Sequence, residues 1–154
     1  MIREARKNQY VAEGAIEAEI LPLVARSSGV TENAGKLDIW GEVSSGKMKN
    51  LWFREDGDYA ELRITEQFSS ASLSLCAAVG QHSGIFDIYV NGEKKLTQDL
   101  WSGHAGMTTP LISLGEIQPE NNAFTIRFVF REKSPNASGK RERYGLGIDY
   151  FIIK

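Results

Sequence analysis

The strongest constraint on the fold is a segment late in the chain in which every second side chain is strongly apolar. Residues 124–131 read Phe-Thr-Ile-Arg-Phe-Val-Phe-Arg, so that an apolar side chain occupies every second position. Residues 72–79 and 86–90 alternate in the same way. Because successive side chains of a strand point to opposite faces of a sheet, each segment is expected to be a strand with one buried face.

Turn signals divide much of the remaining sequence into further short strands. The Asn91-Gly92 pair is the strongest short-range signal of a β-hairpin. Residues 61–64 alternate after an Asp-Gly-Asp turn, and residues 111–114 lie between Pro and Gly. About eight to ten short strands separated by such turns indicate an all-β fold, an antiparallel two-sheet β-sandwich of the jelly-roll type. The longer loops are expected at residues 24–35, 44–49, 101–110 and 133–144.

Length and composition predict one globular domain. The 154 residues are 42% hydrophobic and 25% charged, which is ordinary for a globular protein. We expect a single domain over residues 1–154, with residues 1–12 as a loosely held N-terminal extension. A formal net charge of −2 argues against a nucleic-acid partner, and no apolar run approaches the roughly 20 residues that cross a membrane. The lone Cys76 excludes an intrachain disulfide.

Residue types common in active sites are present, but their arrangement does not favour catalysis. Both histidines stand among Ser and Gly in expected loops, without a nucleophile elbow, a zinc-protease helix or a P-loop. The Gly-x-Gly at residues 145–147 precedes a strand, whereas a dinucleotide-binding turn follows one. Asp56 and Asp58 are better explained as solvated acids of a tight turn than as a glycosidase pair. The sequence therefore predicts that the chain is not an enzyme.

Acidic residues near the two ends of the chain suggest a cation site. Residues 16–20 read as a strand, on which Glu17 and Glu19 would lie on one face, roughly 6–7 Å apart. Asp149 is the one acid of the otherwise apolar residues 145–154. If the first and last strands are neighbours, three carboxylates meet, and charges of one sign do not gather without a cation.

The aromatic residues offer a second candidate site. Trp40, Trp52, Trp101 and Tyr144 fall at expected strand ends or in loops. An indole in a loop suits the apolar face of a sugar ring, and planar polar side chains nearby would bond to its hydroxyls. Each Trp could equally cap the core of the sandwich, and the sequence alone leaves both interpretations open.

The order of these features resembles a known family. The chain is similar to the calcium-dependent carbohydrate-binding modules of the galactose-binding-like β-sandwich superfamily, which are accessory domains of bacterial polysaccharide-processing enzymes. The likeness covers about residues 12–154 and rests on the order of short segments, each weak alone. These segments are Ile16-Glu-Ala-Glu19, Asn50-Leu-Trp-Phe53, Gly57-Asp-Tyr-Ala-Glu-Leu62, Ile85-Phe-Asp-Ile-Tyr-Val-Asn-Gly92, Asp99-Leu-Trp101 and Gly147-Ile-Asp-Tyr-Phe-Ile152.

The resemblance implies a role for particular residues. It assigns a structural calcium ion to Glu17, Glu19 and Asp149. It places a glycan site in loops at one edge of the sandwich, which maps onto Trp40, Trp101 and Tyr144. We expect His104 and Arg143 to act there as polar partners. The chain departs from the family at residues 146–148, Leu-Gly-Ile, where the family often has an Asn just before the final acid.

Two classes of function follow from the sequence. The first is a non-catalytic carbohydrate-binding module that binds an oligo- or polysaccharide. The second is a structural or protein-interaction sandwich that packs against a catalytic neighbour or self-associates. The sequence shows no signal peptide, and the resemblance implies a secreted or periplasmic location as part of a longer bacterial protein.

Overall fold

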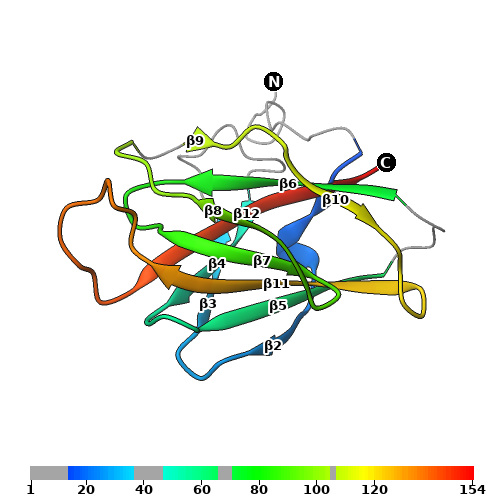
Figure 1. The fold of residues 1–154 in the computed structure, drawn as a ribbon, viewed down its shortest axis with the longest axis horizontal. Coiled ribbons are helices and arrows are strands. Elements are labelled where there is room, and N and C mark those ends of the chain that lie inside the picture. The colour runs from blue at the N-terminus through cyan, green and yellow to red at the C-terminus, as the bar shows by residue number, and fades with distance from the viewer. Residues whose placement is uncertain (1–13, 37–46, 66–70, 105–106) are drawn as a thin grey trace.

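Two antiparallel β-sheets pack face to face in the computed structural model, which describes residues 14–36, 47–65, 71–104 and 107–154 (Figure 1). The expected N-terminal extension and Trp40 lie outside the described residues. Within the described ranges there is no α-helix, and the one 3₁₀-helix, η1 (Ala18–Ile20), is too short to cross a membrane. The all-β sandwich that the alternating segments predicted is therefore confirmed.

Sheet A contains the strands that lie nearest to the candidate sites. Its order is β10-β6-β12-β4-β3, with β1 added beside β12 and β9 beside β6. The bounds are β10 (Ile112–Ile117), β6 (Ala71–Val79), β12 (Tyr144–Ile153), β4 (Lys47–Phe53), β3 (Thr31–Lys36), β1 (Ile16–Glu17) and β9 (Met107–Thr108). Glu17 pairs with Tyr150, so the first and last strands are neighbours, as predicted.

Sheet B has the order β2-β5-β11-β7-β8. Its strands are β2 (Leu23–Arg26), β5 (Tyr59–Thr65), β11 (Ala123–Glu132), β7 (Ile85–Val90) and β8 (Glu93–Asp99). The β7–β8 hairpin turns at Asn91 and Gly92, whose φ angles of 50° and 81° are the left-handed values that a type I′ turn requires.

The core lies between the sheets and follows the alternation of the strands. In β11 the side chains of Phe124, Ile126, Phe128 and Phe130 are all buried. Aromatic rings meet edge to face across the core, with centroids 5.1 Å apart for Phe53 of sheet A and Phe86 of sheet B. Because these side chains occupy the inner faces, every second residue of each strand is left on an outer face, where a binding site can form.

Some of the expected local structures are wrong: the strand at residues 16–20, and parts of the loops at residues 24–35, 44–49 and 101–110, since β4 begins at Lys47 and β9 lies at Met107–Thr108. The segment predicted as a strand over residues 16–20 pairs only at Ile16 and Glu17, because η1 turns the chain inward and buries Ala18 completely. Glu17 and Glu19 therefore do not share a strand face. The loop expected over residues 24–35 is largely β2 and β3, joined by a short turn.

The Asp-Gly-Asp turn is also more structured than predicted. Asp58 is only 7% exposed, and its carboxylate accepts hydrogen bonds from the N–H groups of Arg54 and Glu55 and from the Ser27 hydroxyl. Only Asp56 is the solvated acid that the sequence predicted. Asp58 thus ties the β4–β5 turn to the end of β2, which the sequence alone did not reveal.

Candidate functional site

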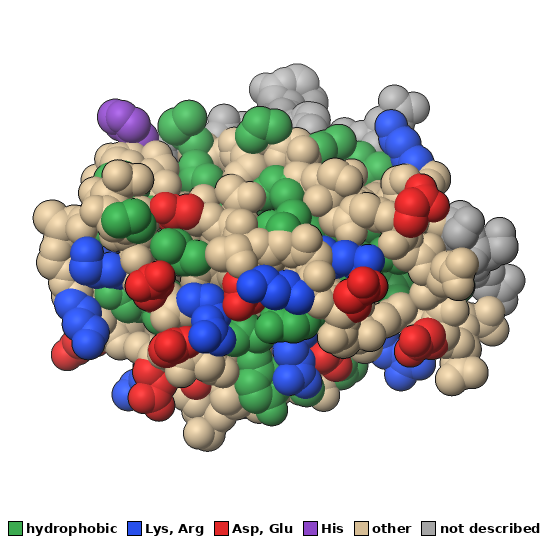
Figure 2. All heavy atoms as spheres, in the orientation of Figure 1, with side chains coloured by type: hydrophobic (Ala, Val, Ile, Leu, Met, Phe, Trp, Pro, Cys, Tyr) green, Lys and Arg blue, Asp and Glu red, His purple; other side chains and the backbone are tan. Residues whose placement is uncertain are grey.

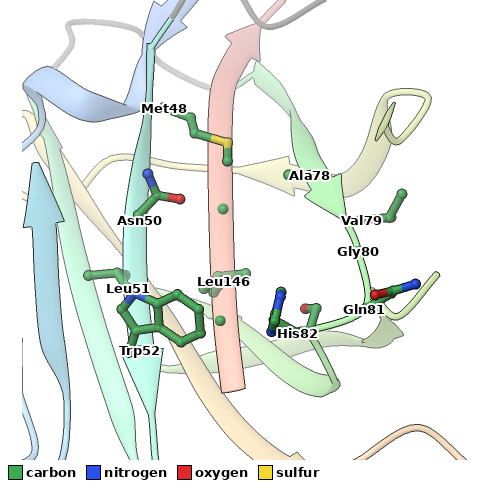
Figure 3. A pocket seen from close by; sticks show the side chains of 13 residues that line it. Met48, Asn50, Leu51, Trp52, Ala78, Val79, Gly80, Gln81, His82 and Leu146 are labelled. Carbon is green, nitrogen blue, oxygen red and sulfur yellow. The ribbon is translucent and has the colours of Figure 1, made fainter. Parts of the chain in front are cut away.

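A hollow on the outer face of sheet A lies over two glycines of β12. Tyr144, Leu146 and Ile148 point into the core, so that Gly145 and Gly147 occupy the outer face between them. The hollow encloses about 260 Å³ and is lined mainly by apolar atoms of β4, β6 and β12 (Figure 3). The missing side chains of the two glycines leave room for this hollow.

Two large side chains of β4 flank the glycines. Trp52 is paired with Gly145 and reaches across it, and Met48 lies across Gly147 (Figure 3). A methyl group on Gly145 would meet Cζ3 of the indole at 3.1 Å, and one on Gly147 would meet Cε of Met48 at 2.8 Å. The glycines are therefore needed for these side chains to lie flat against β12.

Trp52 is held by contacts at its edge and its face. The His82 ring meets it edge-on at a centroid distance of 6.1 Å, and the Arg143 guanidinium carbon lies 4.4 Å from the centre of the Trp52 ring. Partial desolvation, and after it the positive charges of Arg141 and Arg143, lower the pKa of His82. The arrangement fixes an indole beside an open apolar hollow.

A second hollow, of about 230 Å³, lies beside the first at the loop edge of the sandwich. Trp101, Arg141 and Tyr144 line it, together with residues of the 137–139 loop. Gln81 and Ser83 line both hollows, so the two hollows adjoin each other. The Ser83 hydroxyl is buried and has no hydrogen-bond partner among the residues that the structure describes.

The structure brings only some of the predicted glycan-site residues together. Trp101 and Tyr144 line the second hollow, and the Tyr144 ring is buried against Phe130, with its hydroxyl accepting a hydrogen bond from the Arg141 N–H. Arg143 lies at the first hollow, over Trp52. His104 is exposed and lines neither hollow.

The predicted calcium ligands lie on neighbouring elements. Glu17 is in β1, Glu19 is in η1 and Asp149 is fully buried in β12, at a register shift between Ile148 and Tyr150. Carboxylate oxygens suit calcium. Within the described ranges, however, no three acidic, histidine or cysteine side chains are grouped as ligands of one ion. The calcium assignment stays a prediction.

Sequence reasoning missed the first hollow as a site. It noted the glycines at 145 and 147 but tested them only as a nucleotide-binding motif, and it left Trp52 undecided. The signal that was available is the spacing, because glycines two apart in a strand clear one face of it. The sequence alone does not reveal that Trp52 and Met48 lie on the neighbouring strand, β4, with their side chains against the two glycines.

Comparison with known proteins places the fold. A segment of Paenibacillus xanthan lyase matches 94% of this chain with 21% identity and a TM-score of 0.68, and the chain spans 13% of that enzyme. A β-1,3-glucan-binding family 6 module from Bacillus halodurans is matched over 95% of this chain and 96% of its own length, with 18% identity and a TM-score of 0.55.

A third similar structure is a family 36 carbohydrate-binding module in complex with calcium and xylotriose. It covers 91% of this chain and 98% of its own length, with 11% identity and a TM-score of 0.50. No protein-family model and no curated protein sequence matches the chain. At these identities the likeness establishes the fold, which is the β-sandwich of carbohydrate-binding modules.

Proposed function

We propose that the chain is a non-catalytic carbohydrate-binding module and that its glycan lies on the surface formed by the two hollows. The observation that carries this proposal is the Trp52 indole, held beside an open, largely apolar hollow above two glycines. The faces of sugar rings are apolar enough to pack on such a surface. The modules that match this chain over nearly their full length are named for carbohydrate binding, which supports the same choice.

The size of the surface suits a short segment of a sugar chain. The first hollow, at about 260 Å³, is slightly smaller than the roughly 300–1,000 Å³ of typical small-molecule sites. The second hollow adds polar groups, among them Gln81, Ser83 and Arg141. Apolar contact in the first and hydrogen bonds in the second would together fix one orientation of the glycan. Trp101, Tyr144, Arg143, Trp40 and His104 remain the proposed loop contributors.

The test is a screen of the chain against a broad set of polysaccharides, followed by calorimetry on variants. Trp52→Ala and Trp101→Ala should each lose on the order of 1–3 kcal/mol of binding free energy, because the apolar area that the glycan buries against these side chains provides most of the affinity. Tyr59→Ala is the matched control, since Tyr59 is also an aromatic residue beneath an arginine, but on sheet B. A screen without any ligand would favour the structural or protein-interaction alternative.

We also propose the structural calcium ion at Glu17, Glu19 and Asp149. It is supported by the carboxylate chemistry of these residues, by the pairing of β1 with β12 and by the calcium bound to the family 36 module. An ion that binds only the folded chain at one hundred times its dissociation constant stabilises it by about 2.7 kcal/mol. Chelator should therefore lower the melting temperature, and Asp149→Asn should abolish this response. An unchanged melting temperature in the wild type removes the proposal.

The remaining context is also a proposal. We infer that the chain acts beside a catalytic domain that processes polysaccharide, in a secreted or periplasmic bacterial protein. The support is that the chain spans only 13% of the xanthan lyase that it resembles. Determining which domains flank this one in the intact protein tests the inference directly.

A further inference from the structure

We propose that the glycan bound by this chain is acidic, and that Arg141 and Arg143 bind its carboxylate groups. This inference rests on the proposed function and narrows it to one class of ligand. Both arginines border the surface formed by the two hollows, Arg141 in the lining of the second and Arg143 over Trp52 of the first. A guanidinium group thus lies in or beside the lining of each hollow, the first of about 260 Å³ and the second of about 230 Å³.

The Arg143 guanidinium is held in place without losing its donors. Its guanidinium carbon lies 4.4 Å from the centre of the Trp52 ring, which is a cation–π contact, and a guanidinium that lies parallel to the ring keeps its N–H groups for a ligand. The N–H bonds lie in the plane of the guanidinium, and they form the fork that matches the two oxygens of a carboxylate. A uronate ring could therefore pack beside the indole while its carboxylate takes two bonds from Arg143.

Among the residues that the structure describes, no acid competes for this place. The described residues that line the two hollows include no Asp or Glu, and within the same part of the chain neither Arg141 nor Arg143 forms an ion pair. Glu142 stands between them in the sequence but is exposed and lines neither hollow. An unpaired surface arginine is ordinary by itself. Two of them at the edge of an acid-free binding surface give that surface a positive potential.

A second observation points to a ligand at the same place. Ser83, which is 7% exposed, lies where the hollows join, and its buried hydroxyl has no hydrogen-bond partner within the described part of the chain. Buried hydroxyl groups are rarely left without a partner, because that costs free energy. A small rotation of this side chain would let it donate to an oxygen of a sugar bound across the junction.

The first experiment compares acidic polysaccharides with forms of the same polymers in which the carboxyl groups are reduced to alcohols. Polygalacturonate, alginate and hyaluronan serve as probes, with a set of neutral polysaccharides beside them. We expect at least one acidic polymer to bind, and its reduced form to bind about tenfold more weakly, as expected for losing hydrogen bonds to a charged group. Binding of the acidic form should also weaken as salt is raised.

The outcomes separate this inference from the function on which it rests. If neutral polymers bind as well as or better than every acidic one, the acidic assignment is overturned while carbohydrate binding stands. If no polymer binds, both fail. Equal affinity for dextran sulfate would also overturn the carboxylate assignment, because it would show attraction to any dense negative charge.

The second experiment assigns the carboxylate to the two arginines. Arg143→Gln and Arg141→Gln should each weaken binding of the acidic polymer about tenfold and leave its reduced form unaffected. Arg63→Gln, an exposed arginine of β5 on the other sheet, changes the net charge equally and should alter affinity less than twofold. Melting temperatures of all three variants establish that they are folded. If all three variants lost the same affinity, the change in net charge alone would explain the loss, and the assignment of Arg141 and Arg143 as carboxylate ligands would be overturned.

Discussion

An arginine lies over an aromatic ring on each sheet, and the two pairs differ in one respect. On sheet B, the Arg127 guanidinium carbon is 4.2 Å from the centre of the Tyr59 ring, and its Nε also bonds to Glu61 at 2.9 Å. On sheet A, Arg143 stacks on Trp52 at 4.4 Å without an ion pair to any described residue. The same stacking contact is thus completed by a carboxylate on one sheet and left incomplete on the other.

The surroundings of the two arginine–aromatic pairs also differ in how far charged side chains are matched by opposite charges. Acidic and basic side chains are interspersed over the visible face of the molecule, where β5, β11 and β7 lie (Figure 2), and Asp87 contacts both Lys94 and Arg131 there. The outer face of sheet A instead has the bare glycines of β12 beside Trp52. A charged side chain that is paired within the protein has little left to offer a ligand, whereas an unpaired charge beside an apolar hollow can bind a ligand of opposite charge.

The largest effect on stability is expected at the β4–β5 turn, which joins the two sheets, because disrupting this turn would disturb both sheets together. Asp58→Ala removes three hydrogen bonds, of which two come from backbone N–H groups of Arg54 and Glu55. At about 1 kcal/mol for each bond, the free energy of unfolding should fall by about 3 kcal/mol. Asp56→Ala is the control, and its exposed ion pair with Arg131 should contribute at most about 0.5 kcal/mol. Chemical denaturation measures both, and equal losses would contradict the assignment.

The same carboxylate makes stability depend on pH. Burial by itself raises the pKa of Asp58, but the N–H groups of Arg54 and Glu55, the Ser27 hydroxyl and the charge of Arg54 outweigh it and lower the pKa below its ordinary 3.8. The unfolded chain therefore binds this proton more readily than the folded one. The stabilisation is present above about pH 4 and is lost as the pH falls from there through the folded pKa. The stability difference between wild type and Asp58→Asn should accordingly shrink between pH 7 and pH 3.

A smaller effect on stability is expected from filling the hollow on the outer face of sheet A. In Gly147→Ala the new methyl group would lie 2.8 Å from Cε of Met48 and 2.9 Å from Cβ of Ala78. We expect a loss of about 1 kcal/mol in stability and weaker glycan binding, because the neighbours must move into the hollow. Gly80→Ala is the matched control for stability, since its methyl group would meet no atom within 4 Å; because Gly80 also lines the hollow, the affinity of Gly147→Ala is compared with that of the wild type. A stable Gly147→Ala variant with full affinity would show that the hollow is not the binding surface.

The smallest effect is expected from making the sheet B pair resemble the sheet A pair. Glu61→Gln removes the charged partner of Arg127 and should cost less than about 1 kcal/mol, since the Arg127 side chain is 38% exposed. Glycan affinity should stay unchanged, because Tyr59 lines neither of the two hollows. Gain of an acidic ligand by this variant would mean that an unpaired arginine over an aromatic ring is sufficient without the glycines.

The fold could be predicted wherever alternation is strong. The segment at residues 124–131 is β11 almost to the residue, and that at 72–79 is β6. β2 and β3 were missed, because residues 24–35 contain two glycines and lack a continuous apolar face. Their pairing with β5 and β4 is decided by partners distant in the sequence, which local pattern does not reveal.

The candidate site was less predictable than the fold for a related reason. Trp101 and Tyr144 were placed in loops and do line one hollow, but the Trp52 hollow depends on the register that sets Trp52 opposite Gly145. A change of one residue in that register would turn the indole to the other face of the sheet. Strand register is a property of two segments at once, so neither segment alone predicts it.

The pairing of β1 with β12 bears on how the domain responds to mechanical force. Ile16 lies opposite Phe151 and Glu17 opposite Tyr150 in antiparallel register. A force that pulls the N-terminal end of β1 away from the C-terminal end of β12 therefore breaks this ladder one residue pair at a time, instead of shearing all its hydrogen bonds together. Lys154, by contrast, exchanges two backbone hydrogen bonds with Ser72 of β6. A stretched chain should therefore release β1 first, with Glu17, while the Trp52 surface keeps its shape under load.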